Sequence, residues 1–272
     1  MTAFCREKPD AEPVKMTPMG WLRVVLRLIP AMIVLLAGVV ATLILRLPER
    51  LIAGQARPLT SGITTWVCRS LLLIIGIRLT LKGDVMNRGG AVVANHSSWL
   101  DILVLNARKR IYFVSKAEVE TWPGIGFLAR LTGTVFITRR SRDAARQKNL
   151  FQDRLSLGHR LLFFPEGTST DGLRVVSFKS TLFQAFFAPE LGEEMAIQPV
   201  TARFIAPPDA SADFYGWWGD MELAPHLLKV LAHPKRGAVE IICHDPLFVR
   251  DFSDRKALAK ACEAAIGSVF EG

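Results

Sequence analysis

The chain has 272 residues, half of them hydrophobic, and a formal net charge of +9. This length suits one sizeable core, and the hydrophobic share exceeds the soluble norm only modestly. The four cysteines form neither a C-x-x-C pair nor a disulfide framework, which fits a reducing compartment. A basic chain can bind nucleic acid, but the sequence has no nucleic-acid-binding motif, repeat or aromatic-basic stripe, so no nucleic-acid partner is expected.

The hydrophobic excess lies near the N-terminus. Residues 28–45 carry no charge and have basic flanks, so this run is long enough to cross a bilayer or to lie deeply in it. A signal peptide is the competing interpretation, which we disfavour because the run is long and ends in Leu47, Pro48 and Glu49 rather than in small residues. The basic flanks favour an anionic cytoplasmic leaflet, which predicts a location on the cytoplasmic face of the inner or plasma membrane.

A second apolar run, residues 63–81, contains Arg69 and Arg78. Two arginines make a full span costly, so we expect a helix that lies in the membrane interface or packs on the domain that follows; an ordinary buried helix is the alternative. These runs divide the chain into a membrane-associated helical region, residues 1–82, and a second domain, residues 83–272.

For the basic residues 108–110 we favour a solvated face.

Beyond the first apolar run, short β-favouring segments alternate with helical patterns, which predicts an α/β fold. We expect a mostly parallel or mixed sheet flanked by helices, with membrane-associated helices at the N-terminus. Strands are expected at residues 78–81, 91–94, 111–114, 134–138, 161–164, 196–204 and 239–243. Helices are expected at residues 99–106, 125–131, 141–157, 181–187, 221–231 and 254–269.

The strand at 91–94 ends just before His96, and the helix that follows carries Asp101. Five helical residues amount to about 500°, so the two side chains can meet only if His96 lies in the turn, before a helix capped by Ser97 or Ser98. The carboxylate then accepts a hydrogen bond from one imidazole nitrogen and leaves the other nitrogen free to take a proton. This is the arrangement of a general base.

A second polar turn, with Pro165, Glu166 and Gly167, follows the strand at 161–164. In an α/β sheet both strand ends can open on the same edge, where ligands usually bind. The two turns are therefore candidates for one site.

Four blocks in this order resemble the glycerolipid acyltransferase family typified by bacterial lysophosphatidic acid acyltransferase. The first block, N-H-x-S-x-x-D, is matched at residues 95–101, and the second, a Gly, a hydrophobic strand and an Arg, at 133–139. The third block, F-P-E-G-T, is matched at 164–168, and the fourth, a hydrophobic residue shortly before Pro-Val, at 197–200. The resemblance covers roughly residues 80 to 205.

The resemblance implies an enzyme that moves a fatty acyl chain from an acyl thioester to the hydroxyl of a lysolipid. Acyl carrier protein or coenzyme A would carry the acyl chain as co-substrate, membrane lipids would be the partners, and no cofactor is expected. His96 would be the base and Asp101 would orient it. Substrate contacts are expected from Lys116, Arg139, Glu166, Gly167 and Thr168.

The acceptor is indicated by a departure from the phosphatidate-forming members, which usually carry Arg after F-P-E-G-T. Residues 169–172 are here Ser-Thr-Asp-Gly, which resembles acyltransferases for other lysolipids, as do the segments 115–123 and 218–226. We expect lyso-ornithine lipid as acceptor, with lysophosphatidic acid as the alternative and a non-catalytic membrane scaffold as an alternative of another class. The sequence has no G-x-S-x-G elbow, so direct transfer without an acyl-enzyme is expected, and it has no metal-site histidine spacing, so no metal is expected.

Overall fold

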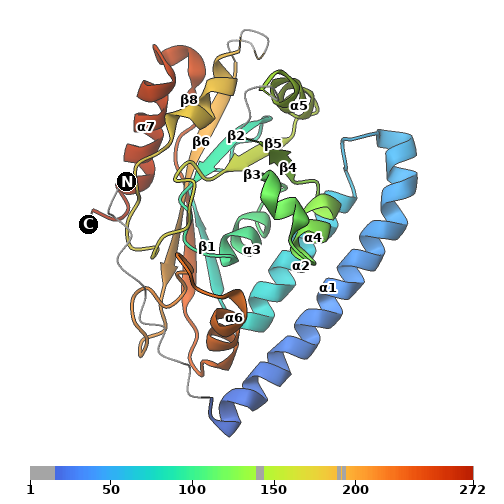
Figure 1. Cartoon of the computed structure of the whole chain (residues 1–272), viewed down its shortest axis with the longest axis vertical. Coiled ribbons are helices and arrows are strands. Elements are labelled where there is room, and N and C mark those ends of the chain that lie inside the picture. The colour runs from blue at the N-terminus through green and yellow to red at the C-terminus, as the bar shows by residue number, and fades with distance from the viewer. Residues whose placement is uncertain (1–15, 139–143, 189–190, 192–193, 272) are drawn as a thin grey trace.

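The computed structural model describes residues 16–138, 144–188, 191 and 194–271. Two N-terminal helices, α1 (Pro18–Ala53) and α2 (Thr60–Ile75), form a hairpin along one side of a sheet and its covering helices (Figure 1). The strands are β1 (Arg78–Lys82), β2 (Gly90–Ala94), β3 (Tyr112–Lys116), β4 (Val135–Ile137), β5 (Arg160–Phe163), β6 (Ala196–Ile205), β7 (Ala238–Cys243) and β8 (Leu247–Phe248). The other helices are α3 (Leu100–Asn106), α4 (Ile125–Thr132), α5 (Ala144–Ser156), α6 (Leu223–Ala232) and α7 (Arg255–Gly267), with 3-10 helices η1 (Ala117–Thr121), η3 (Ser180–Phe187) and η5 (Val249–Asp251).

The sheet is mixed, as predicted. Its strand order is β1-β7-β6-β2-β5-β3-β4, with β8 paired to β6. All pairs are parallel except β6–β7 and β6–β8. Val93 of β2 lies opposite Phe163 of β5 and Pro199 of β6, so the carboxyl ends of β2 and β5 are neighbours. This is the sheet edge where α/β proteins usually bind ligands.

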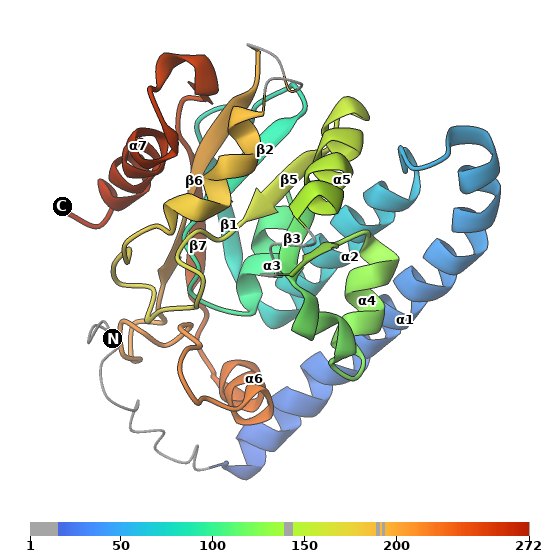
Figure 2. The ribbon, with the colours of Figure 1, turned by 45° about the horizontal axis from the view of Figure 1, so that its top comes forward.

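Strand β2 is buried on both faces, and its alternate residues face two cores. Val92 and Ala94 belong to a core shared with α2, α3 and α6, whereas Ala91 and Val93 belong to one shared with α7 and η3. Figure 2 shows α3 and α7 on opposite sides of the sheet. A strand that is covered on both faces needs apolar residues at every position, which explains the continuous apolar run of β2.

Helix α1 buries only a narrow stripe and exposes apolar side chains over the rest of its surface. At 100° per residue the buried positions fall within about 40° of the helix circumference. The stripe packs on α2 and α6, and a Cβ at Gly38 would lie 2.3 Å from Cγ2 of Val67, so glycine permits this close approach. The buried residues of α1 are Gly20, Val24, Gly38, Thr42 and Glu49. Its exposed apolar residues include Leu26, Ile33, Leu36, Ile44, Leu47 and Ile52.

The sequence locates all the long strands to within two residues of their observed bounds. The apolar run 63–81 is not one helix, because α2 ends where Gly76 takes the left-handed conformation with φ 89° and β1 follows. Residues 181–187 lie in a 3-10 helix rather than an α-helix, and β8 and η1 were not predicted. The division into residues 1–82 and 83–272 stays a prediction, and β1 of the first part pairs with β7 of the second.

Candidate active site

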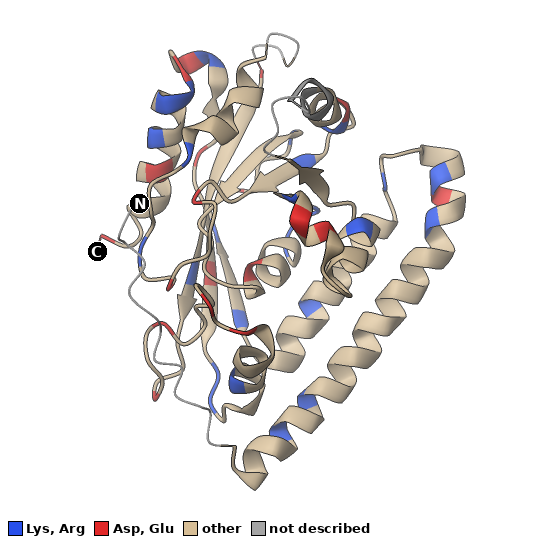
Figure 3. Cartoon of the chain, in the orientation of Figure 1, with Lys and Arg blue, Asp and Glu red and all other residues tan. Residues whose placement is uncertain are grey.

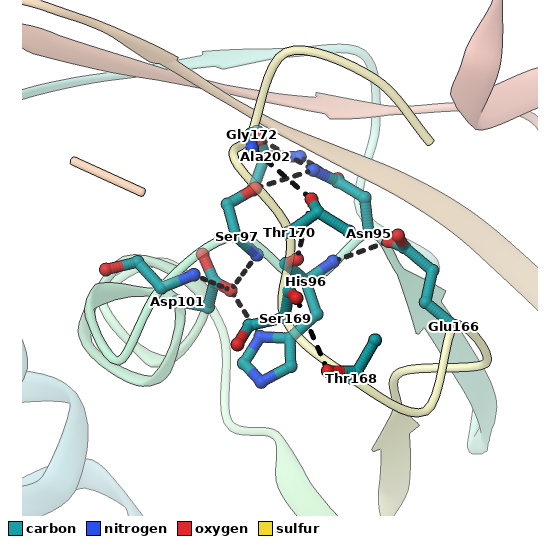
Figure 4. Close-up of polar contacts among 11 residues, drawn as sticks. Asn95, His96, Ser97, Asp101, Glu166, Thr168, Ser169, Thr170, Gly172 and Ala202 are labelled. Atoms are coloured by element: carbon teal, nitrogen blue, oxygen red, sulfur yellow. Dashed lines mark hydrogen bonds and ion pairs between the residues drawn. The ribbon is translucent and has the colours of Figure 1, made fainter. Parts of the chain in front are cut away.

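His96 lies in the turn after β2, and Asp101 lies in the first turn of α3. Nδ1 of His96 is 2.7 Å from Oδ2 of Asp101, so the two side chains meet as the spacing predicts (Figure 4). The carboxylate is fully buried, while the imidazole side chain is 24% exposed. The imidazole is therefore partly accessible, while its Nδ1 is held by a buried carboxylate.

The surroundings of Asp101 determine which imidazole nitrogen carries the proton. Oδ2 also accepts hydrogen bonds from the backbone N–H groups of Ser97 at 2.8 Å and Ser98 at 3.0 Å. An ionised carboxylate only accepts, so Nδ1 of a neutral imidazole must donate to it. Nε2 then keeps its lone pair, which is what a base requires.

The helix is not capped as predicted. The flanking residue of α3 is Trp99, which makes no side-chain capping bond, and the Ser98 hydroxyl is buried with no partner among the described residues. The Asp101 carboxylate instead binds the free backbone N–H groups that precede the helix. Its negative charge also lies at the helix N-terminus, where the helix dipole stabilises it.

Phe164 and Glu166 hold the His96 turn from the β5 side. The Phe164 ring stacks on the imidazole with centroids 4.1 Å apart and planes 13° apart. Glu166 is 2% exposed, and its two oxygens accept from the backbone N–H of His96 at 2.8 Å and of Val176 at 3.2 Å. Figure 4 shows Glu166 and Asp101 on opposite sides of His96. One Glu166 oxygen therefore positions the His96 turn, and the other ties Glu166 to the segment at Val176.

Burial raises the pKa of Glu166 to about 8 from an ordinary 4.5, although its two backbone hydrogen bonds act in the other direction. A carboxyl group with a raised folded-state pKa stabilises the fold below the unfolded-state pKa, and this contribution is lost as pH rises through the folded-state value. We expect the melting temperature of the protein in detergent to fall between about pH 4.5 and about pH 8, and Glu166→Gln to flatten that slope. Melting curves of both proteins across this range test it; equal slopes would contradict it.

The remaining predicted site residues lie around the third block. The Lys116 ammonium donates to the Gly167 carbonyl at 3.1 Å, and Thr168 is exposed. Gly167 has φ 74°, and a Cβ there would lie 2.4 Å from Nζ of Lys179, so this turn requires glycine. Arg139 lies outside the described residues, and its headgroup contact stays a prediction.

Two residues that the sequence analysis did not assign to the site complete its scaffold. Thr170 donates to the His96 carbonyl from its backbone N–H at 2.8 Å and from its hydroxyl at 3.2 Å. The Asn95 side chain donates to the Ala202 carbonyl at 3.0 Å and accepts from the Ala202 N–H at 2.8 Å, which ties the turn to β6. Asn95 is part of the first block, which signals such a role. Thr170 lies in the Ser-Thr-Asp-Gly pattern at residues 169–172, which indicated the acceptor but not a bond to the His96 turn.

A family model described as Acyltransferase matches residues 76–203. Lyso-ornithine lipid O-acyltransferase of Rhodobacter capsulatus is 53% identical over 96% of this chain and 93% of its own length. The chain belongs to the acyltransferase family, and it is an enzyme.

Other relatives mark the breadth of the family. Lyso-ornithine lipid O-acyltransferase of Pseudomonas aeruginosa is 35% identical over 81% of this chain and 83% of its own. The 1-acyl-sn-glycerol-3-phosphate acyltransferase of Neisseria gonorrhoeae is 37% identical over 42% of this chain and 45% of its own length. The crystal structure of the 1-acyl-sn-glycerophosphate acyltransferase of Thermotoga maritima has a TM-score of 0.65 at 19% identity, covering 93% of this chain and 95% of that one, and shares the fold.

The family and helix α1 together indicate association with a membrane. Among the described residues, α1 is the one helix long and apolar enough to cross a bilayer. Most of its circumference is exposed and apolar, which is unusual for a helix that faces water.

Proposed function

We propose that this enzyme transfers a fatty acyl chain from an acyl thioester to the hydroxyl of lyso-ornithine lipid. The observation that carries the proposal is the His96–Asp101 pair, with a free Nε2, in a chain whose relatives over most of its length are named for this reaction. The pair supports acyl transfer, and the relatives support the acceptor.

In this mechanism Nε2 of His96 takes the proton of the acceptor hydroxyl as its oxygen attacks the thioester carbonyl carbon. The carbon–sulfur bond breaks, and the leaving sulfur receives that proton from the imidazolium. Asp101 keeps Nδ1 protonated and stabilises the imidazolium while it exists. The products are an ester and a thiol, and the imidazole returns to its neutral form. General-base assistance supplies about 10²–10⁴ in rate, and the positioning of both substrates supplies much of the rest.

The acyl donor in this proposal is acyl carrier protein or coenzyme A, and no cofactor takes part. Both carriers are anionic, and the net charge of +9 attracts either one. Charge therefore favours a thioester of this kind without selecting between the two.

The loop after the third block supports an ornithine headgroup over a phosphate. An ornithine headgroup carries a carboxylate and an ammonium group, whereas a glycerol phosphate carries only negative charge. Asp171 forms an ion pair with Arg174, and the neighbouring Thr170 binds the His96 carbonyl. The loop that bonds to the His96 carbonyl thus carries a pair of opposite charges, which complements a zwitterion better than a dianion. The scaffold alternative lacks support, because the chain keeps the complete histidine–carboxylate pair of an active enzyme.

We place α1 in the interface of the cytoplasmic leaflet rather than across the bilayer. Its buried stripe runs from Gly20 to Glu49 and packs on α2 and α6, so most of the length of α1 is in contact with the rest of the protein. The exposed apolar faces then enter the lipid, while Arg23 and Arg27 bind backbone carbonyls at the end of α6. A helix that crossed the bilayer would have to leave these partners.

Acyl transfer to a panel of acceptors tests the proposed function. The full-length protein is incubated with labelled acyl thioesters and either lyso-ornithine lipid or lysophosphatidic acid, and products are identified by mass. We expect the diacylated ornithine lipid to form at least about tenfold faster, and Asp171→Asn to reduce that preference because it removes the negative charge of the Asp171–Arg174 pair. Consumption of lysophosphatidic acid alone would contradict the acceptor assignment, and no thioester consumption with any lysolipid would contradict the reaction.

A further inference from the structure

A cavity of about 570 Å³ lies at the end of α2, away from the His96 turn. The C-terminal part of α2, the beginning of β1 and the residues before β7 line it, together with Arg108 beyond α3. Strand β1 is three positions from β2 in the sheet, which corresponds to about 14 Å at the usual strand spacing. The cavity is thus separate from the proposed reaction centre.

Four arginines line the cavity: Arg69, Arg78, Arg108 and Arg236. Its lining contains no Asp or Glu, and within the described part of the chain none of the four guanidinium groups has a carboxylate partner. Figure 3 shows basic residues on α2 and on the strands beside it. Four cations without counter-charges around one cavity favour an anionic ligand.

Two of these arginines are held in place by backbone carbonyls. Nε of Arg69 donates to the Ala107 carbonyl at 2.5 Å, and Nη2 of Arg108 donates to the Leu79 carbonyl at 3.1 Å. Each guanidinium has five N–H donors, so further donors are available after these bonds. Such fixed, planar donors suit the oxygens of a phosphate group.

The cavity has an apolar rim on the side of α2. Trp66, Arg69 and Leu73 are exposed and follow each other at spacings of three and four residues, so they lie on one face of the helix. Leu73 is 76% exposed and also lines the cavity. Trp and Arg on one helix face are typical of the headgroup level of a membrane. An apolar rim beside a basic cavity fits a ligand with a phosphate at one end and acyl chains at the other.

We infer that this cavity binds the phosphate headgroup of an anionic membrane phospholipid, which is neither the acyl donor nor the acceptor. The acyl chains of that lipid lie along Trp66 and Leu73, and the four arginines surround its phosphate. The bound lipid fixes the depth and rotation of the enzyme at the bilayer surface. The concave shape and the apolar rim favour a lipid over an acidic protein surface.

Vesicle binding by an Arg78→Gln/Arg236→Gln protein tests the inference. Vesicles are made of phosphatidylcholine alone or with phosphatidylglycerol, and bound protein is measured by sedimentation. The matched control is Lys256→Gln/Lys260→Gln on α7, across the sheet from α2, which removes the same formal charge. We expect phosphatidylglycerol to strengthen vesicle binding of the wild type and of the control. In the arginine variant we expect this increase in binding to be smaller by roughly tenfold or more.

Several outcomes would overturn the inference. Equal losses in the two variants would indicate general charge attraction, and no loss in the arginine variant would exclude the cavity. Thermal stabilisation by inorganic phosphate with no gain from phosphatidylglycerol would indicate a free anion. Unchanged vesicle binding with a raised KM for acyl carrier protein or coenzyme A thioesters in neutral micelles would make the cavity a donor site. Melting curves confirm that each variant is folded, and the binding readout does not depend on catalysis, so it is independent of the proposed reaction.

Discussion

The protein with His96→Ala is expected to lose acyl transfer by about 10²–10⁴-fold while it still binds membranes. The substitution removes the Nε2 lone pair that takes the acceptor proton, and it leaves α1 and its apolar surface unchanged. Turnover with a labelled thioester and lyso-ornithine lipid measures the loss. The assay is run on protein recovered with vesicles, so that weaker binding is not mistaken for weaker catalysis.

The control for this prediction is a histidine outside the site. His233 lies beyond the end of α6 and its ring bonds to the Lys235 carbonyl, so His233→Ala is expected to keep near-normal turnover. Near-normal turnover of the His96→Ala protein would remove His96 from the mechanism.

The protein with Asp101→Asn is expected to lose nearly as much activity, because the carboxylate determines the imidazole tautomer. Oδ2 receives three hydrogen bonds, from His96, Ser97 and Ser98. An amide nitrogen in that position would face three donors, and an amide oxygen there would lose the negative charge that stabilises the imidazolium. We expect turnover to fall about 10²–10⁴-fold, together with a lower melting temperature because buried donors lose their acceptor.

Asp220→Asn, an exposed substitution of the same kind, serves as the control and is expected to leave both quantities unchanged. The double variant His96→Ala/Asp101→Asn supplies a sharper criterion. If the two residues act as one unit, their losses of activity are not additive, and the double variant is about as slow as His96→Ala alone. Additive losses would show that Asp101 acts through something other than His96.

Local sequence pattern predicted the elements that carry the site. The apolar strand at 91–94, the polar turn and the helix with Asp101 were each predicted from the sequence, and their geometry brings His96 and Asp101 together as expected. The serine cap was wrong: α3 has no side-chain capping bond, and the Asp101 carboxylate in its first turn accepts instead from the N–H groups of Ser97 and Ser98, four and three residues earlier. The chain favours the bond that also orients the histidine.

Contacts between distant residues could not be predicted in the same way. Glu166 lies 70 residues from His96 in the sequence. Its hydrogen bond to the His96 N–H forms because β2 and β5 are neighbours in the sheet, and the sequence does not show the strand order. The buried stripe of α1 is likewise hidden, because residues 28–45 are apolar on every face. The arginines around the α2 cavity come from four separate segments, so their convergence is a property of the fold.

Rescue of a His96→Gly protein by imidazole tests most directly whether an imidazole held by Asp101 performs acyl transfer. The substitution leaves a space between the Phe164 ring and the Asp101 carboxylate, which free imidazole can enter. We predict that added imidazole restores formation of the diacylated ornithine lipid in a saturable way, and that Asp101→Asn in the same protein abolishes the rescue. A folded, membrane-bound His96→Gly protein that gains nothing from imidazole, or that needs none, would contradict the account.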